Sequence, residues 1–334
     1  MAAQRPVMHD VARLAGVSHQ TVSRVLNSHP NVSSATRQRV MVAMEQLNYR
    51  PNAFARGLVT KRSSRIGVMS FDSRMFGPGS TLRAIERAAR AQGYGVAVVG
   101  LSDTTGGDAT GAVEALDDQS VDGIIVIAPN QAAVRALGVL PRGVPVVALE
   151  AEYRPDLPVV AIDQFAGARM ATEHLLGLGH DTVWHVAGPS DWREAVLRID
   201  GWRAALAAAS MRTPSLLHGD WSPRSGYEAG LQLAARDDVT AVFAANDQMA
   251  LGVIHALAER GKSVPDDVSV VGFDDIPEAE FFLPGLTTVR QNFDEVGRRG
   301  LDLLVRILGD PASEHRERLT IAPEFVLRAS TRPC

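Results

Sequence analysis

The stretch Asp10 to Asn27, DVARLAGVSHQTVSRVLN, has the layout of two short helices joined by a tight turn. Apolar residues recur at helical spacing in its first half, namely Val11, Ala12, Leu14 and Ala15. Gly16 permits the turn, because glycine adopts a positive φ without steric cost. Ser18 is placed to cap the second helix. We therefore predict a helix-turn-helix over this stretch.

The second of these helices has an apolar face and a polar face. Its apolar side chains, at i, i+3 and i+4, are Val22, Val25 and Leu26, and its polar side chains are His19, Gln20, Ser23, Arg24 and Asn27. Gln20 and Arg24 are four residues apart and share one side of the helix. In the major groove of DNA, glutamine can bond bidentately to adenine and arginine to guanine. The pattern favours a helix that reads base edges, and the alternative is a surface helix pair with ordinary polar residues.

The charge of the chain is divided unevenly. The formal net charge is −4, which by itself argues against nucleic acid, but residues 1–62 carry a net charge of +7 and the remainder −11. A basic head on an acidic body is typical of a DNA-binding domain attached to a part that does not bind DNA. The basic block coincides with the helix-turn-helix.

A third helix is expected after the polar loop Ser28-His29-Pro30-Asn31. Ser33 would cap it, and its apolar stripe would contain Val40, Met44 and Leu47. Its outward side chains are expected to be Thr36, Arg37 and Arg39. Three short helices then form an all-α head of about fifty residues, which is near the lower limit for an independent fold.

A fourth, basic segment follows the head. Asn52 can cap a helix from Ala53 to Val59, which is too short to be stable alone because isolated helices below about 12–15 residues are marginal. Such a segment can fold when it docks on DNA. Leu58 would then be the apolar side chain that wedges into the minor groove. The alternative is a plain linker in which Leu58 packs on the body.

The composition restricts the class of protein. Hydrophobic residues make up 46% of the chain, and Cys334 is the only cysteine. Internal disulfides and cysteine-based zinc sites are therefore excluded. The first residues contain no apolar signal-peptide core, and no run approaches the length of a membrane span. We expect a soluble cytoplasmic protein with no contact to membranes.

From residue 64 onward, apolar strand-like runs alternate with helical runs. The strand-like runs begin with Ile66–Phe71 and end with Ser269–Phe273, and the helical runs extend from Leu82–Gln92 to Ala250–Arg260. This rhythm predicts parallel sheets with helices on both faces. There are too many strands for one comfortable sheet, so we expect a two-lobed α/β body with two doubly wound parallel sheets. Ligands in such folds bind beyond the carboxyl ends of the strands.

Polar residues occur where these strands end. Glu150, Asn246 and Asp274 each follow an apolar run directly. Asp274 can accept hydrogen bonds from two hydroxyls, Asn246 can donate and accept, and Arg198 can donate in a planar fork. Trp221 offers a flat face to a sugar ring. This mixture fits an uncharged, hydroxyl-rich ligand.

Other roles remain open for several of these residues. Asp247 and Asp275 fit helix caps better than ligand contacts, Trp221 alone fits a core position, and Asp274 fits a cap as well as a ligand contact. The chain contains no nucleophile elbow, phosphate loop, zinc-protease motif or dinucleotide fingerprint. His180 and His185 lack a clear third ligand for a metal. We therefore expect no enzyme activity, no metal and no cofactor.

Several motifs of this chain resemble the LacI/GalR family of bacterial transcription regulators in order and spacing. In the head they are DVARLAGVSHQTVSRVLN, VSSATRQRV, NYRPN and ARGL, and in the body GHDTVWHVAG, RIDGW, FAANDQMALG, VPDDVSVVGFDD and LTTVRQNF. The resemblance implies a helix-turn-helix headpiece at 1–50, a hinge helix and linker at 51–63, and a core at 64–334 like that of periplasmic sugar-binding proteins. It implies an N-lobe of about 64–162 and 293–320 and a C-lobe of about 163–292 and 321–330. The chain would cross between the lobes near 162, 292 and 321.

The resemblance also implies roles for single residues. The base-reading positions would be His19, Gln20 and Arg24, with Leu58 intercalating at the operator centre. The phosphate contacts would be Ser18, Thr21, Ser23, Asn27, Asn31 and Thr36. The effector-binding positions would be Phe76, Glu150, Arg198, Trp221, Asn246, Asp274, Gln291 and Phe293. Val7 stands where the family has a threonine cap, which weakens that helix end, and Glu150 stands where a sugar-responsive branch has an aspartate, which leaves the sugar open.

The function implied by the resemblance is a sugar-responsive repressor of sugar-utilisation genes. A homodimer would bind a pseudo-palindromic stretch of double-stranded DNA, and a small-molecule sugar, a galactoside or plant-derived oligosaccharide, would release it. The chain has no leucine heptad tail near its end, which favours a dimer over a tetramer. One alternative is a sugar that acts as co-repressor, or a protein that activates transcription. A sugar-binding transport protein is the alternative of another class.

Overall fold

The computed structural model describes residues 6–26, 29–49, 63–71, 74–101, 109–128, 143–151, 157–310 and 317–334. The chain forms two compact units, Met1–Ser64 and Arg65–Cys334, each of which is described by itself below. Asn27 and the predicted hinge with Leu58 lie outside the described residues.

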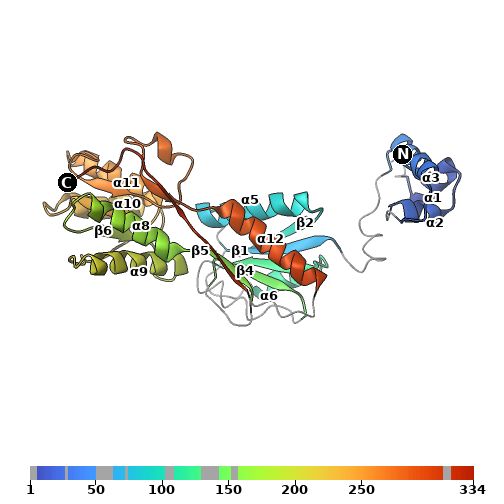
Figure 1. Cartoon of the computed structure of the whole chain (residues 1–334), viewed down its shortest axis with the longest axis horizontal. Coiled ribbons are helices and arrows are strands. Elements are labelled where there is room, and N and C mark those ends of the chain that lie inside the picture. Colours follow the sequence, from blue (N-terminus) through green and yellow to red (C-terminus); the bar gives the residue numbers. More distant parts are fainter. Residues whose placement is uncertain are drawn as a thin grey trace. The chain divides into compact units, whose positions relative to one another are not determined.

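The first unit is a three-helix head. Its helices are α1 (Met8–Ala15), α2 (His19–Leu26) and α3 (Ser34–Gln46), which Figure 1 shows in blue. Gly16 ends α1 with φ +63°, and the Ser18 hydroxyl accepts from the Thr21 amide at 3.2 Å. A small core forms around Val11, Val22, Val25 and Val40, which are all buried. The predicted helix-turn-helix is confirmed.

Three details of the head differ from the expectation. Leu14 is 50% exposed, because it lies on the side of α1 that turns away from the core. Val7 caps α1 without a side-chain hydrogen bond, but Asp10 accepts from the Val7 amide at 3.0 Å and so replaces part of the cap. Arg37 does not point freely outward. It donates to the Val25 carbonyl at 3.4 Å and the His29 carbonyl at 3.2 Å, and so satisfies carbonyls at the end of α2.

The second unit begins with an N-lobe built on a six-stranded parallel sheet of order β11-β5-β4-β3-β1-β2. Its strands are β1 (Arg65–Phe71), β2 (Gly95–Leu101), β3 (Gly123–Ile127), β4 (Val146–Leu149), β5 (Val159–Ile162) and β11 (Arg318–Ile321). Helices α5 (Phe76–Ala91) and α12 (Phe293–Gly309) pack together on one face, and α6 (Ala109–Asp117) packs against the other. The buried strands are almost wholly apolar because helices cover both faces.

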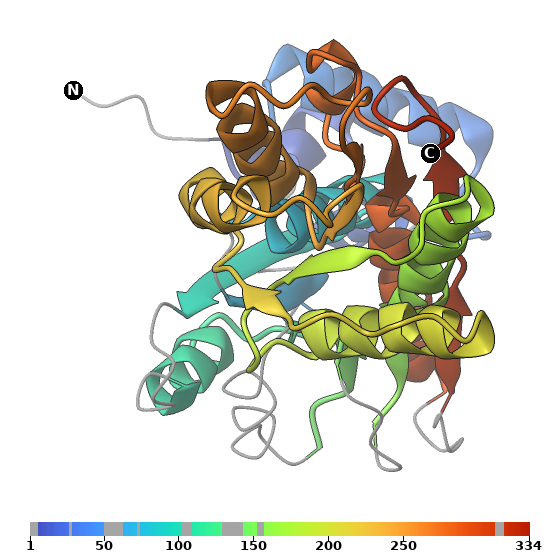
Figure 2. The ribbon, with the colours of Figure 1, turned by 90° about the vertical axis from the view of Figure 1, so that its left-hand side faces the viewer.

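The C-lobe repeats this design with a four-stranded parallel sheet of order β7-β6-β8-β9. Its strands are β6 (Trp184–Ala187), β7 (Leu217–His218), β8 (Ala241–Ala244) and β9 (Ser269–Val271). Figure 2 shows α8 (Gln164–Gly177) and α9 (Arg193–Ala208) on one side of this sheet and α10 (Pro223–Ala234) and α11 (Asp247–Glu259) on the other. The expected two-lobed α/β fold is confirmed.

Three chain segments connect the lobes. The first joins β5 to α8. The second joins β10 (Thr288–Arg290) to α12, and the third joins β11 to β12 (Glu324–Val326). Strands β10 and β12 pair antiparallel, and the Asp163 amide donates to the Ile321 carbonyl at 2.9 Å. The three connections are therefore bound to one another by backbone hydrogen bonds.

Helix α5 begins six residues earlier than its pattern predicts. The expected start was Leu82, but α5 starts at Phe76 and contains Pro78. The first four amides of a helix have no partner within it, so a proline in the first turn removes no helical hydrogen bond. Within the described ranges, no helix has the length and apolarity needed to cross a membrane.

Helices α10 and α11 cross at glycines, which gives a prediction for stability. A Cβ on Gly252 would lie 2.0 Å from the Pro223 carbonyl oxygen and 2.4 Å from the Tyr227 amide nitrogen, both in the backbone of the other segment. Gly252→Ala should therefore force the helices apart and lower the free energy of unfolding by about 1–3 kcal/mol. Gly177→Ala is the matched control, because its Cβ would meet nothing within 4 Å. Urea denaturation measures both, and equal midpoints would contradict the packing described.

Candidate functional site

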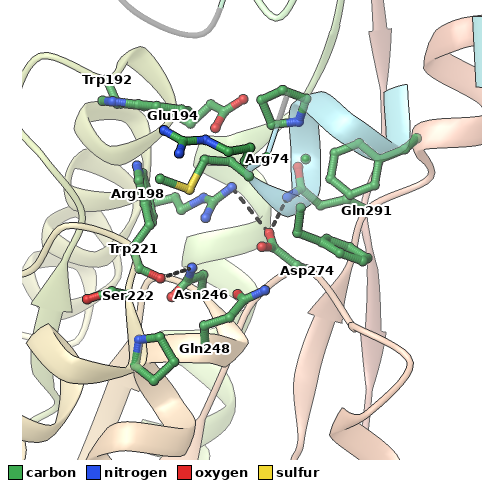
Figure 3. A pocket seen from close by; sticks show the side chains of 16 residues that line it. Arg74, Trp192, Glu194, Arg198, Trp221, Ser222, Asn246, Gln248, Asp274 and Gln291 are labelled. Atoms are coloured by element: carbon green, nitrogen blue, oxygen red, sulfur yellow. Dashed lines mark hydrogen bonds and ion pairs between the residues drawn. The ribbon is translucent and has the colours of Figure 1, made fainter. Parts of the chain in front are cut away.

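A pocket lies in the second unit, where the two lobes meet (Figure 3). Its cavity volume is about 230 Å³. Its lining residues are Arg74, Met75, Phe76, Gly77, Pro78, Trp192, Glu194, Arg198, Trp221, Ser222, Pro223, Asn246, Gln248, Asp274, Gln291 and Phe293. This volume is somewhat smaller than a typical pocket for a drug-sized ligand, so it suits a small ligand.

Most of the predicted effector-binding residues line this pocket. They are Phe76, Arg198, Trp221, Asn246, Asp274, Gln291 and Phe293. The first and last of these residues, Phe76 and Phe293, are more than two hundred positions apart in the sequence. The connections between the lobes bring them together. Their role as effector contacts stays a prediction, and the pocket is the place where it can be tested.

Arg198 forms the buried cationic group of the pocket. It lies on α9 with 2% of its surface exposed. Its Nε donates to Gln164 Oε1 at 2.9 Å, its Nη1 donates to the Ala245 carbonyl, and its Nη2 lies 3.7 Å from Asp274 Oδ1. The guanidinium also stacks on the Phe273 ring, 3.9 Å from its centroid. These contacts hold the planar fork in one orientation.

Asp274 is the acidic group that faces Arg198. It follows β9 with φ +107°, a conformation that favours glycine, and it accepts from Gln291 Nε2 at 2.5 Å. Burial raises the pKa of Asp274 to about 6, although Arg198 and the Gln291 hydrogen bond both oppose the rise. It caps no helix in the described structure. Strained backbone beside a cavity is a common feature of binding sites.

Asn246 holds one wall of the pocket in place. Its Oδ1 accepts from the Met249 amide at 2.9 Å, which makes it the cap of α11, and its Nδ2 donates to the Trp221 carbonyl at 3.0 Å. Trp221 has φ +72° and its ring covers Gly188, where a Cβ would lie 2.3 Å from the ring. The Trp221 ring can occupy this position because Gly188 has no side chain.

Two aromatic pairs contribute most of the apolar lining. Trp192 and Trp221 of the C-lobe meet edge to face with centroids 5.6 Å apart, and Phe76 and Phe293 of the N-lobe do so at 5.8 Å. The Trp221 Nε1 atom is buried without a hydrogen-bond partner within the described structure. The pocket thus joins apolar ring faces to a few buried polar groups, a combination that suits a sugar ring.

Glu150 differs from the other predicted effector contacts, and its role stays a prediction. Glu150 does not line the pocket. Glu150 lies behind the pocket, and both of its carboxylate oxygens accept from the Ile162 amide at 3.3 Å. Burial and the nearby Glu194 raise the pKa of Glu150 to about 8, and burial raises the pKa of Glu194 to about 7. The backbone of Glu150 adopts φ +54°, which aims its side chain at the lobe connection.

Two further aspartates were expected to cap helices. Asp247 instead accepts from the Ile276 amide at 2.9 Å and the Thr288 hydroxyl at 2.6 Å, while Asn246 supplies the cap. Asp275 pairs with Arg290 and Arg328, each at 2.7 Å. Both carboxylates therefore bind the segments that lead into and out of the lobe connection.

The sequence prediction missed several pocket residues. They are Arg74, Met75, Gly77, Pro78, Trp192, Glu194, Ser222, Pro223 and Gln248. A signal for Glu194 was present, because it precedes Arg198 by four residues on the same helix and so shares its face. Arg74 and Met75 lie before α5 in a segment whose glycines and proline gave no helical pattern. No group of histidine, cysteine or acidic side chains suited to a metal occurs among the described residues.

The polar side of α2 forms the second candidate site. His19, Gln20 and Arg24 are exposed, and Thr21 and Ser23 are half-buried at its margins. The Ser18 hydroxyl bonds to the Thr21 hydroxyl at 2.9 Å, and the Ser33 hydroxyl bonds to Thr36 in the same way. The Asn31 amide donates to His29 Nδ1 at 3.3 Å. The three predicted base-reading side chains are thus accessible on one short helix.

An exposed helix-turn-helix and a two-lobed core with a pocket together define a ligand-sensing DNA-binding regulator. The model of "Bacterial regulatory proteins, lacI family" matches residues 7–52, and that of the "Periplasmic binding protein-like domain" matches residues 172–331. The chain is 36% identical to the lactose operon repressor of Escherichia coli K12, over 95% of this chain and 89% of the relative. It is 34% identical to the ribose operon repressor of that organism, over 97% and 99%. The chain belongs to the lacI family of bacterial regulatory proteins.

Solved structures show the same relationship. The lac repressor dimer bound to operator and the anti-inducer ONPF has a TM-score of 0.88 and 34% identity, covering 98% of this chain and all of the other. The complex of the transcriptional regulator CelR with cellobiose has a TM-score of 0.72 and 32% identity, with the same coverage. The family, the fold and the DNA-binding class are therefore established. These relatives are transcriptional repressors and not enzymes.

Proposed function

We propose that this protein represses transcription as a homodimer on a pseudo-palindromic operator in the cytoplasm, and that a neutral sugar in the interlobe pocket releases it. The observation that carries the proposal is the pocket itself. It joins the buried Arg198 and Asp274 to two aromatic pairs, in a chain whose head exposes Gln20 and Arg24.

The chemistry of the pocket supports a neutral, hydroxyl-rich ligand. Arg198 can donate and Asp274 can accept, so a sugar hydroxyl placed between them can do both at once. Apolar rings from both lobes would contact the C–H faces of the sugar. The relatives support this ligand class, since one is a lac repressor bound to ONPF and another is bound to cellobiose.

The proposed switch has two states that differ in the arrangement of the lobes. Because the pocket is lined from both lobes, a ligand binds more tightly to the arrangement in which both walls reach it. The predicted hinge segment, residues 51–63, would transmit this change to the heads. Thermodynamic reciprocity then requires that operator DNA weaken sugar binding by the same factor that sugar weakens operator binding.

The homodimer is supported by apolar side chains that the single chain leaves exposed. Phe281 is 76% exposed, Leu283 is 91% exposed, and Leu251 on α11 is 42% exposed. We propose a second copy of this chain as the partner, because the lac repressor, which matches over its full length, is a dimer on its operator.

Leu283→Asp is expected to shift the protein from dimer to monomer, because a charge would replace an apolar contact. Analytical ultracentrifugation measures the change, and the unfolding midpoint should stay constant because Leu283 makes little contact within its own chain. Met211→Asp, at a residue that is 40% exposed after α9, is the matched control and should stay dimeric. An unchanged dimer in Leu283→Asp would place the interface elsewhere.

The function is tested by selecting DNA from a random pool and then titrating sugars into the complex. We expect the selected sites to be near-palindromic, and we expect lactose, cellobiose, galactose, glucose or ribose to release the DNA in a gel-shift assay. DNA binding without sequence preference would contradict the proposed role as an operator-binding regulator. If calorimetry detects no binding of any of these sugars, the proposal of a sugar effector is contradicted. If a sugar instead tightens DNA binding, the effector acts as a co-repressor and does not release the protein.

A further inference from the structure

Gln164 is a buried polar side chain beside the pocket, but it does not line it. It is the first residue of α8, directly after the first connection between the lobes, and 1% of its surface is exposed. Its Oε1 accepts from Arg198 Nε at 2.9 Å, and its Nε2 donates to Gln291 Oε1 at 2.7 Å. One amide therefore joins two side chains from separate segments.

These contacts belong to a closed ring of four side chains. Gln291 receives the hydrogen bond from Gln164 and donates its own Nε2 to Asp274 Oδ1 at 2.5 Å. Arg198 Nη2 lies 3.7 Å from the same oxygen and closes the ring. All three hydrogen bonds run in one direction, from Arg198 through the two amides to Asp274. Figure 3 shows Arg198, Gln291 and Asp274 converging at this point.

The separation between Arg198 and Asp274 is the unusual feature of the ring. An arginine and a carboxylate that are both this deeply buried normally form hydrogen bonds of about 2.7–2.9 Å. Here the Arg198 Nε is bound by Gln164 and its Nη1 by the Ala245 carbonyl, so the guanidinium cannot turn its fork toward Asp274. Asp274 is held from the other side by Gln291. The ion pair therefore stays open, which means that Arg198 and Asp274 do not form a direct hydrogen bond.

We propose that Gln164 is a positioning residue of the effector site, which keeps Arg198 and Asp274 far enough apart for a ligand hydroxyl to enter between them. Such a hydroxyl would accept from Arg198 Nη2 and donate to a carboxylate oxygen of Asp274. The inference rests on the proposed function for the identity of the ligand. The open ion pair itself is a property of the chain without any ligand.

The place of the two amides in the fold gives the ring a second consequence. Gln164 follows the connection from β5, and Gln291 lies in the connection from β10 to α12. A change in the lobe arrangement would alter the distance between these connections and hence the Gln164–Gln291 bond. Closing or opening the Arg198–Asp274 pair is therefore coupled to the movement of the lobes.

The first test is a crystal structure of Gln164→Met without ligand. Methionine keeps the length of the side chain but removes its donor and acceptor. We expect Arg198 to turn and to contact Asp274 within about 3 Å. Thr172→Val is the matched control, because Thr172 is buried on the same helix and bonds only to the Ala168 carbonyl at 2.8 Å in the described structure. If the separation stays at 3.7 Å in Gln164→Met, Gln164 does not hold the pair open.

The second test uses the pH dependence of unfolding, which a purely structural role would not change. The charged groups that act on Asp274 are Arg198, which lowers its pKa, and the acids Glu194 and Asp247, which interact with it unfavourably. The folded pKa of about 6 lies above the ordinary aspartate value of 3.8, so the wild type loses stability as the pH rises between these values. A direct Arg198–Asp274 ion pair in Gln164→Met would lower the pKa of Asp274. The variant would therefore lose less folding stability than the wild type over this pH range.

We therefore expect the difference in denaturation midpoint between wild type and Gln164→Met to become smaller from pH 4 to pH 7. Thr172→Val should show a difference that does not depend on pH. A difference in Gln164→Met that is constant or grows with pH would overturn the proposal.

The third measurement is calorimetry with the five sugars named above. For each sugar that binds the wild type, Gln164→Met should raise the Kd at least tenfold and Thr172→Val less than twofold. An unchanged Kd in Gln164→Met would overturn the positioning role. If no sugar binds the wild type, the proposed function fails, and the crystal structure and the pH profile still decide the inference.

Discussion

Asp274→Ala is expected to bind operator DNA like the wild type and to stay bound when sugar is added. The carboxylate lies opposite Arg198 in the pocket and can accept from two hydroxyls of a sugar. Each hydrogen bond to a charged group contributes about 1.5–3 kcal/mol, so its loss should weaken sugar binding by a factor on the order of one hundred or more. A gel-shift titration with the sugar that releases the wild type measures the effect.

Two further variants make this prediction specific. Asp274→Asn keeps the shape of the side chain and one acceptor, so we expect an intermediate loss of sugar affinity. Asp238→Ala removes a half-exposed carboxylate that does not line the pocket and should respond like the wild type. An Asp274→Ala protein that is still fully released by sugar would show that the pocket is not where the effector acts.

Arg24→Ala is expected to weaken operator binding with little change on random DNA. Arg24 is exposed on α2, and within the described part of the chain no side-chain hydrogen bond or ion pair restrains it. Its fork matches the acceptors of guanine in the major groove. Loss of one such contact costs about 1–3 kcal/mol per half-site, and a dimer on a pseudo-palindrome would lose it twice. Fluorescence anisotropy with operator and scrambled duplexes at one salt concentration measures both affinities.

Arg24→Lys separates base reading from simple attraction to phosphate. Lysine keeps the positive charge but lacks the planar pair of donors. We expect it to retain binding to scrambled DNA and to lose part of the preference for operator. An equal loss of affinity on both duplexes in Arg24→Ala would instead assign this residue to the phosphate backbone.

The helix-turn-helix could be predicted from the sequence because every signal for it is local. Gly16 marks the turn, Ser18 and Ser33 mark the caps, and apolar spacing marks the helices. The parallel sheets were also predictable, because buried strands such as β3 and β5 are continuous apolar runs between helical patterns. The position of Asp274 after such a strand was enough to nominate it for a site.

Other features of the site depend on segments that meet only in the folded chain. Gln164 and Gln291 are 127 residues apart, and no local pattern shows that their amides bond to each other. Glu150 follows a strand as a ligand residue would, yet both of its carboxylate oxygens accept from the Ile162 amide behind the pocket. The helical pattern places Arg37 among the outward side chains of its helix, but it donates to carbonyls of another segment.

The opening stretch DVARLAGVSHQTVSRVLN by itself determined the helix-turn-helix, since caps, turns and periodicity act over a few residues. The alternation of strands and helices determined the class of the core for the same reason. Only the tertiary structure decided which polar side chains share the pocket, which of them lie behind it, and how far apart Arg198 and Asp274 are held. Those properties arise from three connections between two lobes, and hydrogen bonds across such connections leave no periodic signal in a sequence.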